Sequence, residues 1–347
     1  MHRYLILLLT LLILTIVPVS GEVILYWPGE DSIGTSDIKD ITNAPGESLV
    51  FATTNGISIF NDGNWEILHS KARDRRGYLE GIPLNDYVLD AEYDIYGNLW
   101  LGYSDGIQIY DGYTKPRTMR YPERTLIIYS INDLQARSDE MWVATGNSGV
   151  YCYSKGEWKW FQPYTDKSPG ANRIVSMAVD YSTGALVLAS DNEGQYILNV
   201  TSDNPGFDEI ISHKISKDMQ NVRSDPSGGV YFFNETDIVH YNEISGAVNI
   251  LNVTDLSEDV HNINDVYSTK DGKYIIGTNY GLYAWKEGII LKHLSRKDLK
   301  ENNIKKVFVD ADGRWWFVNK ILTGYYYEKE FEPLVSIEFQ YFDSLNF

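Results

Sequence analysis

The chain has 347 residues and carries 48 Asp and Glu against 30 Lys and Arg, a formal net charge of −18 at pH 7. This acidic balance argues against binding of bulk nucleic acid or anionic membranes, because affinity for phosphate chains comes mainly from Lys and Arg. Hydrophobic residues make up 43% of the chain and aromatic residues 14%. The chain can therefore bury a large core, and its many aromatic side chains favour strands over helices.

The first 21 residues have the organisation of a secretory signal. Arg3 precedes an almost wholly apolar run of 16 residues, Tyr4 to Val19, and Ser20 and Gly21 then supply the small residues that signal peptidase requires. The run is shorter than the roughly 20 residues that cross a bilayer. We predict a signal peptide over residues 1–21 and a secreted or cell-surface protein with no membrane span after cleavage. The alternative is an uncleaved N-terminal anchor.

Two features of the body agree with export. Asn199, Asn234 and Asn252 each begin an Asn-x-Thr triplet, so they are candidate glycosylation sites of a glycoprotein. Cys152 is the only cysteine, so an intrachain disulfide is excluded and packing alone must stabilise the fold. The surrounding sequence, Val-Tyr-Cys-Tyr, is strand-like and favours a small buried apolar side chain over a catalytic thiol.

After a strand-like run at residues 23–27, one phrase recurs along the chain. Its clearest copy, residues 94–112, reads as a turn, a short strand, a Ser-Asp-Gly connection, a second strand and an Asp-Gly turn, with apolar residues alternating in both strands. Asp237 opens the second strand in the fifth copy. A glycine opens it in the other six, at Gly56, Gly106, Gly149, Gly194, Gly281 and Gly324. The gaps between successive copies are 50, 43, 45, 43, 44 and 43 residues.

This spacing predicts an all-β fold, a seven-bladed β-propeller of four-stranded antiparallel blades, over residues 22–335. Residues 336–347 are then an aromatic C-terminal tail. In the sixth copy we expect strands at 263–268, 274–278, 281–285 and 289–294. Small residues recur four or five positions before the glycine, which would let neighbouring blades approach closely: Ala52, Gly102, Ala144, Ala189 and Gly277. Phe233 breaks this rule, so we interpret the fifth blade as degenerate.

Closure of the ring requires a partner for the last blade. The run at 23–27 is spaced like the outermost strand of a blade that precedes the first copy, so we expect this N-terminal strand to complete the seventh blade. Such pairing would bury a strand edge that otherwise invites aggregation. The alternative is that residues 331–339 complete it.

The phrase Gly-Asn-Leu-Trp-Leu-Gly-Tyr-Ser-Asp-Gly-Ile at residues 97–107 resembles the two-component regulator propeller repeat. Residues 51–57, 141–150 and 274–282 are similar to it as well. The resemblance implies an extracellular, ligand-binding, sensor-type propeller, a class whose members often sense polysaccharide ahead of a membrane span and a kinase. This chain contains no such kinase, so only the recognition role is carried over. The repeat motif forms scaffold and identifies no binding residue.

Catalytic and metal-binding patterns are nearly absent. Residues 102–106 spell the Gly-x-Ser-x-Gly of hydrolases, but between two strands rather than at the strand-to-helix turn that the chemistry needs. The acidic turns at residues 270–272 and 310–313 lack the spacing of calcium loops, and the histidines show no metal-ligand spacing. We predict no catalytic residue, no metal and no cofactor, and we expect a binding protein rather than an enzyme, with a polysaccharide hydrolase or lyase as the alternative.

Basic residues concentrate in the connections that lead from each outermost strand to the next innermost strand. The turns expected on the opposite face are instead rich in Asp, for example Asp94, Asp225, Asp271 and Asp312, which predicts a molecule with two faces of opposite charge. The longest connection places an aromatic beside arginines, which suits a carboxylated sugar or similar anion. The hypothetical ligand site comprises Arg73, Arg75, Arg76, Tyr78, Arg117, Arg120 and Arg124.

The partner predicted for this site is an anionic ligand, a polysaccharide or a cell-surface protein. Two other interpretations stay open. The charges could be solvated and offset by local acids such as Asp74 and Glu123, and the chain could be a structural cell-surface component that associates through its aromatic tail.

Overall fold

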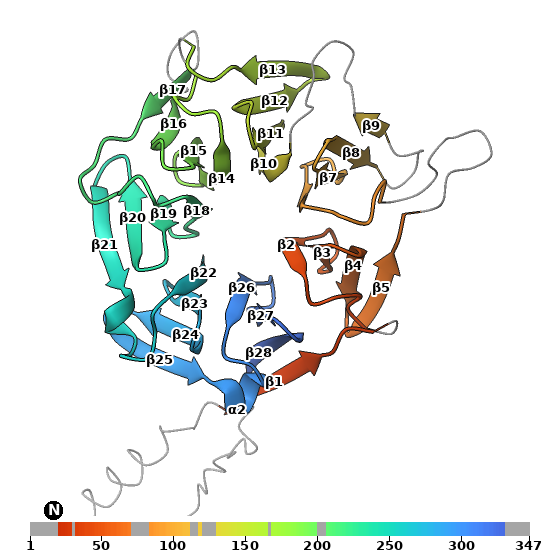
Figure 1. Ribbon diagram of the computed structural model, residues 1–347, viewed down its shortest axis with the longest axis vertical. Coiled ribbons are helices and arrows are strands. Elements are labelled where there is room, and N and C mark those ends of the chain that lie inside the picture. The colour runs from red at the N-terminus through yellow and green to blue at the C-terminus, as the bar shows by residue number, and fades with distance from the viewer. Residues whose placement is uncertain are drawn as a thin grey trace, which may run out of the picture.

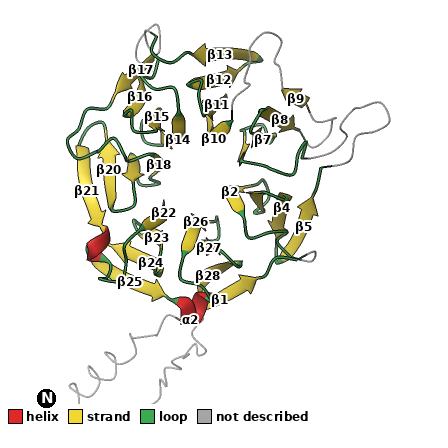
Figure 2. Ribbon diagram, viewed as in Figure 1, coloured by secondary structure: helices red, strands yellow, loops and turns green. Residues whose placement is uncertain are grey.

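Seven four-stranded antiparallel sheets are arranged as a ring around a central axis in the computed structural model, which confirms the predicted seven-bladed β-propeller (Figure 1). The structure describes residues 20–29, 32–70, 83–111, 117–119, 130–165, 168–199 and 206–329. Of Arg117 and Asn199 only the backbone is described. Within these ranges the secondary structure is almost wholly strand, with two short helical turns at the periphery of the ring (Figure 2).

Each blade runs outward from the central axis. The innermost strands are β2 (Ile38–Asn43), β6 (Asp90–Tyr93), β10 (Ile131–Arg137), β14 (Ile174–Asp180), β18 (Asn221–Ser224), β22 (Ile263–Ser268) and β26 (Ile304–Val309). The second strands are β3 (Leu49–Thr53), β7 (Leu99–Tyr103), β11 (Glu140–Thr145), β15 (Ala185–Ser190), β19 (Val230–Phe233), β23 (Tyr274–Thr278) and β27 (Trp315–Asn319).

The outer half of each blade completes the sheet. The third strands are β4 (Gly56–Asn61), β8 (Gly106–Tyr110), β12 (Val150–Ser154), β16 (Gln195–Asn199), β20 (Asp237–Asn242), β24 (Gly281–Lys286) and β28 (Thr323–Lys329). The outermost strands are β5 (Asn64–Leu68), β9 (Arg117–Met119), β13 (Glu157–Phe161), β17 (Gly206–Glu209), β21 (Gly246–Asn252), β25 (Ile289–Leu294) and, in the seventh blade, β1 (Ser20–Tyr26). The helices are η1 (Val253–Asp255) and α2 (Arg296–Leu299).

Antiparallel strands alternate in direction, so the ring has two rims. The hairpin rim carries the turns between first and second strands and between third and fourth strands, for example residues 94–98 and 155–156. The connection rim carries the other turns and the segments between blades, for example residues 83–89 and 295–303. These names are used below.

The N-terminal strand closes the ring, as predicted. β1 pairs with β28 along its whole length, from Ser20 opposite Lys329 to Tyr26 opposite Thr323. The Tyr26 ring lies 5.7 Å from Phe60 and 5.2 Å from Trp65 of the first blade, and it stacks 6.2 Å from Trp316 of the seventh. β1 therefore joins the last blade to the first as well as covering an edge.

The recurring glycine has a steric cause, which Gly281 illustrates. Its φ of +115° lies in a region that other residues rarely adopt, and a Cβ there would lie 2.4 Å from the carbonyl oxygen of Leu294 on the outermost strand of the same blade. The fifth blade keeps four strands although Asp237 replaces this glycine and Phe233 replaces the small residue, so the deviation leaves its topology intact.

The small residues upstream of the glycine face the neighbouring blade, as expected. A Cβ on Gly277 in the sixth blade would lie 2.8 Å from Cγ2 of Ile304 and 2.9 Å from Cγ1 of Val307, both on the innermost strand of the seventh blade. Ile304 and Val307 are buried. Glycine at this position thus lets the two blades pack at a distance that any side chain would prevent.

We expect Gly277→Ala to destabilise the protein by about 1–2 kcal/mol. The added methyl group overpacks a filled core, and this cost exceeds the stabilisation that alanine gives by lowering the conformational entropy of the unfolded chain. Chemical denaturation of the purified variant measures this change. Gly146→Ala is the matched control, since its Cβ would meet its nearest neighbour, Oδ1 of Asn132, at an ordinary 3.5 Å. Equal stability of the two variants would contradict this account of blade packing.

Candidate functional site

A channel of about 460 Å³ runs between the innermost strands, and all seven of them contribute residues to its wall. Figure 1 shows these strands surrounding the axis of the ring. Four carboxyl side chains line the channel from the first three blades: Asp40, Asp90, Glu92 and Asp133. Basic side chains line it as well: Lys39, Arg223 and Lys306.

A repeated backbone irregularity positions the channel residues. In five blades the register of the innermost strand shifts between an Ile and the residue two positions later: Ile38/Asp40, Ile131/Asp133, Ile174/Ser176, Ile263/Asp265 and Ile304/Lys306. The residue after the shift pairs with the small residue of the second strand in four of these blades: Asp40 with Ala52, Asp133 with Ala144, Ser176 with Ala189 and Asp265 with Gly277. In these five blades, the bulge therefore changes the direction in which one polar side chain of the innermost strand points.

Three of these five side chains, Asp133, Ser176 and Asp265, bind the next blade, and so does Asp90 of the second blade, whose innermost strand has a regular register. The backbone N–H of Leu134 donates to Asp90 at 2.5 Å, and that of Met177 donates to Asp133. The backbone N–H groups of Val222 and Val307 donate to Ser176 at 2.8 Å and to Asp265 at 3.0 Å. These bonds satisfy backbone N–H groups between adjacent innermost strands, so these acidic and hydroxyl side chains have a structural role.

The channel carboxyl groups are crowded; Asp90 is buried, and Asp40, Glu92 and Asp133 are half-buried. Burial, together with the charge of Asp40, raises the pKa of Glu92 to about 8 and holds the pKa of Asp90 well above its usual range. Burial also raises the pKa of Asp133 to about 7. Opposite them, Arg223 donates to both oxygens of Asp265, at 3.0 and 3.2 Å. Carboxyl groups therefore line one side of the channel, and Arg223, paired with Asp265, lies on the other.

The predicted anion site falls almost wholly outside the described residues. Arg73, Arg75, Arg76, Tyr78, Arg120 and Arg124 lie there, and Arg117 is described only as backbone in β9. Both ends of the long connection that carries the first four are described. The N–H of Ser70 donates to Asp86 at 2.6 Å, and the N–H of Leu84 donates to Gln108 at 2.8 Å. These bonds anchor the connection on the connection rim of blades 1 and 2.

The predicted separation of charge between the rims is wrong in the part of the chain that the structure describes. Four basic residues, Arg223, Lys292, Lys305 and Lys306, lie on strands and not in connections. The described connections mix both signs. Lys217 is followed by Asp218, and Lys297 by Asp298. Alternation of sign within each connection, which counting only basic residues conceals, keeps the described connection rim from being basic.

Several acids of the hairpin rim are part of its turns. Asp94 accepts hydrogen bonds from the N–H groups of Tyr96 and Asn98, both at 2.9 Å, and from the indole of Trp100 at 3.0 Å. Asp310 holds the indole of Trp316 in the same way, at 2.7 Å. These side chains accept hydrogen bonds from groups that have no backbone partner in the turns. This structural role explains why acidic residues recur there, and no ligand is needed to account for them.

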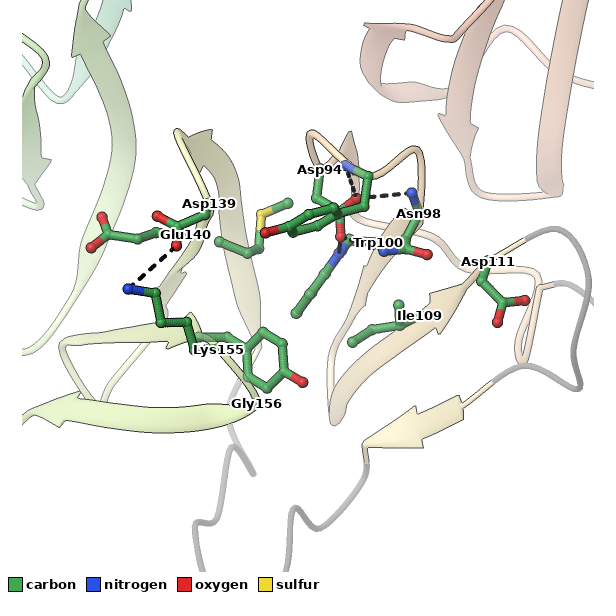
Figure 3. Close-up of a pocket in the computed structure, with 12 residues that line it drawn as sticks. Asp94, Asn98, Trp100, Ile109, Asp111, Asp139, Glu140, Lys155 and Gly156 are labelled. Carbon is green, nitrogen blue, oxygen red and sulfur yellow. Dashed lines mark hydrogen bonds and ion pairs between the residues drawn. The ribbon is translucent and has the colours of Figure 1, made fainter.

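A second hollow, the interblade pocket, opens on the hairpin rim between the second and third blades and has a volume of about 350 Å³ (Figure 3). Five of its residues are apolar or aromatic: Tyr96, Trp100, Ile109, Met141 and Tyr153. Four are acidic, Asp94, Asp111, Asp139 and Glu140, and one is basic, Lys155. Sequence reasoning missed this pocket because it forms only where two blades meet.

The remaining predicted residues have clear environments. Cys152 is buried in β12, and burial raises the pKa of its thiol to about 12, which fits the predicted packing role. Ser104 lies in the two-residue turn between β7 and β8, not at a strand-to-helix turn. The side-chain amides of Asn234 and Asn252 donate to Asp218 at 3.0 Å and to Asp237 at 2.8 Å. The glycosylation sites stay a prediction.

The described residues contain no group of three or more His, Cys, Asp or Glu side chains arranged to hold a metal ion. Among the same residues, no helix has the length and apolar character needed to cross a bilayer.

Comparison with solved structures identifies the fold class as that of several extracellular or surface propellers. The extracellular domain of a putative one-component system, BT4673 of B. thetaiotaomicron, is 17% identical with a TM-score of 0.64, over 88% of this chain and 39% of that one. PorZ, a surface component of the type-IX secretion system of Porphyromonas gingivalis, is 14% identical with a TM-score of 0.64, over 85% and 47%.

Streptogramin B lyase has a similar fold, with 12% identity and a TM-score of 0.64, over 89% of this chain and 98% of that one. This chain therefore spans about two fifths of the BT4673 domain and nearly all of the lyase. At these identities the similarity concerns the fold alone. No profile of a known protein family matches the sequence, and no curated protein matches it.

Proposed function

We propose that this chain is an exported recognition module, a sensor-type propeller that binds an anionic ligand such as an acidic polysaccharide. The observation that carries the proposal is the long connection between β5 and β6, which contains Arg73, Arg75, Arg76 and Tyr78 and is anchored at both ends on the connection rim. A rigid ring that presents a basic, aromatic segment suits recognition, because guanidinium groups bind carboxylates in a forked geometry.

Export and sensing find support in the fold neighbours. The BT4673 structure is the extracellular domain of a putative one-component system, and PorZ is a bacterial surface component of a secretion system. The N-terminal segment, with its signal-like composition, agrees with the same location for this chain.

Binding to polygalacturonate, alginate and heparin, with neutral dextran as the control ligand, tests the proposal. We expect a triple variant, Arg75, Arg76 and Arg120 each to Ala, to weaken binding of at least one acidic polysaccharide by about tenfold or more, and 0.5 M salt to do the same, because exposed charge contacts are screened.

A matched triple variant controls for loss of charge from the same rim: Lys214, Lys217 and Lys297 each to Ala, all of them exposed. Binding that survives both 0.5 M salt and the arginine substitutions would overturn the anionic-ligand assignment. So would equal losses in the two triple variants, because they would indicate a diffuse charge effect.

The second candidate function is that of a polysaccharide hydrolase or lyase, and the channel supplies the observation in its favour. Glu92 and Asp133 have pKa values of about 8 and 7, which suit proton transfer near neutral pH. Against this, Asp133 already accepts a bond from the backbone of the next blade. Release of shortened or unsaturated products in the same polysaccharide assays would favour the enzyme.

A further inference from the structure

The interblade pocket has a wall of aromatic and apolar side chains. The ring of Trp100 lies 5.4 Å from that of Tyr153, tilted by 57°, and Met141 and Ile109 line the pocket beside them. Trp100 is only 1% exposed and its indole N–H is bonded to Asp94, so its ring backs the pocket, and half-buried Tyr153 supplies the accessible aromatic surface on this wall. Tyr96, 71% exposed, leaves a further aromatic ring in solvent at the same pocket.

The charges around this wall favour a cationic ligand. Asp94 accepts hydrogen bonds from donors of its own turn, so its carboxylate lines the pocket as a fixed part of the turn and does not have to contact a ligand. Asp139 adds a carboxylate from the third blade, and Figure 3 shows it next to Lys155. Glu140 also lines the pocket, but its carboxylate is already bonded to Arg137 at 2.6 Å and to the indole of Trp142 at 2.9 Å. The ammonium of Lys155 lies 3.9 Å from Asp139 and its side chain is 84% exposed. An ion pair this exposed and this long is weak, so another cation can take the place of the Lys155 ammonium.

Size and chemistry together narrow the ligand class. A volume of about 350 Å³ accommodates one long side chain or one small molecule. Aromatic faces attract cations and bind alkyl chains, whereas an anion would meet the surplus of carboxylates. A neutral ligand of the same shape would gain the apolar contacts only.

We propose that the interblade pocket binds a lysine-like alkylammonium, with the alkyl stem against Tyr96 and Tyr153 and the ammonium at Asp139 in place of Lys155. This site lies on the hairpin rim, whereas the described ends of the connection that contains the arginines lie on the connection rim, and it prefers the opposite charge. It is therefore independent of the proposed anionic-ligand function, and either can fail alone. The alkylammonium can belong to a lysine of a partner protein or to a free amine.

Calorimetric titration of the full chain with two cationic probes tests the site and separates these sources: a glycine-flanked peptide with one central lysine, and n-pentylammonium. The norleucine peptide, which has a similar stem without the charge, is the reference ligand. We expect at least one cationic probe to bind with a dissociation constant in the millimolar range or tighter, and the norleucine peptide about tenfold more weakly. Tighter binding of the lysine peptide indicates a protein partner, and tighter binding of the free amine indicates a small molecule.

Substitutions locate the binding. Tyr96→Ala and Asp139→Asn should each weaken binding by about three- to thirtyfold, and Lys155→Ala should strengthen it by removing the competing cation. Tyr181→Ala, a 66% exposed tyrosine on the same rim but outside the pocket, is the matched control and should leave binding unchanged. Unchanged thermal unfolding of each variant shows that the fold is retained.

Three results would overturn the proposal. These are equal affinity for the lysine and norleucine peptides, no effect of Tyr96→Ala and Asp139→Asn on a cation that binds, and no binding of either cation by the folded chain.

Discussion

A chain that begins at Pro28, without β1, is expected to unfold at a temperature at least about 10 °C lower than a chain that begins at Ser20. Removing β1 exposes the whole edge of β28, and it uncovers the aromatic cluster in which Tyr26 meets Phe60, Trp65 and Trp316. Loss of a paired strand and its apolar burial costs on the order of 5 kcal/mol or more. The free edge should also make the shortened chain prone to aggregate.

Differential scanning calorimetry measures the change, and two point variants separate closure from mere shortening. Leu25→Asp places a charge against the core shared by the sixth and seventh blades and should lower the unfolding temperature markedly. Ile289→Asp, on the outermost strand of the sixth blade where the side chain is 62% exposed, should have little effect. An unfolding temperature unaffected by loss of β1 would mean that another segment closes the ring.

The fold could be predicted because each blade repeats the same local solution. The recurring glycine marks the place where the third strand begins beneath a carbonyl of the outermost strand. This steric need is seen at Gly56, Gly149, Gly281 and Gly324, and only a small set of residues meets it. The four strands expected in the sixth blade match the structure to within one residue, from β22 to β25. Closure was predictable for the same reason, since residues 23–27 fit the spacing of a blade whose other strands come last.

The channel and the interblade pocket could not be predicted in this way. Asp40, Asp90 and Asp133 are 40 to 50 residues apart and meet only because the ring brings their blades together. One signal for the channel was present in the sequence: an Ile followed two positions later by a polar residue, at Ile38, Ile131, Ile174, Ile263 and Ile304. Its recurrence ahead of the small residues marks the bulge and the side chain that turns toward the axis.

The predicted separation of charge between the two rims was wrong for a different reason. Basic residues were assigned to connections from sequence position alone, and a shift of a few residues moves a side chain from a connection onto a strand. Arg223 shows the consequence, because as part of β18 it enters the channel and binds Asp265. Boundaries of strands are the least certain part of a sequence-based assignment, so surface charge inferred from them carries the same error.

Glu92→Gln is expected to stabilise the protein at pH 9 and to have little effect at pH 5. The pKa of Glu92 is raised to about 8 by burial and by Asp40, so the native state keeps this proton between about pH 4.5 and pH 8, whereas the unfolded chain releases it. The native state then binds more protons than the unfolded state, and stability falls as pH rises through this window. Glutamine removes that penalty and can still accept the hydrogen bond from the Thr42 hydroxyl, 3.0 Å away.

We expect a stabilisation of about 2–4 kcal/mol at pH 9, or an unfolding temperature higher by about 5 °C or more, measured by thermal denaturation at pH 5, 7 and 9. Glu66→Gln, an exposed carboxyl on β5, is the control and should show no such trend. Glu92 shares the channel with Asp90 and Asp133, whose pKa values are raised as well, so part of the pH dependence should persist in the variant. If Glu92→Gln instead lowered stability equally at all three pH values, the side chain would be ionised in the native state, and the channel would hold a fixed negative charge.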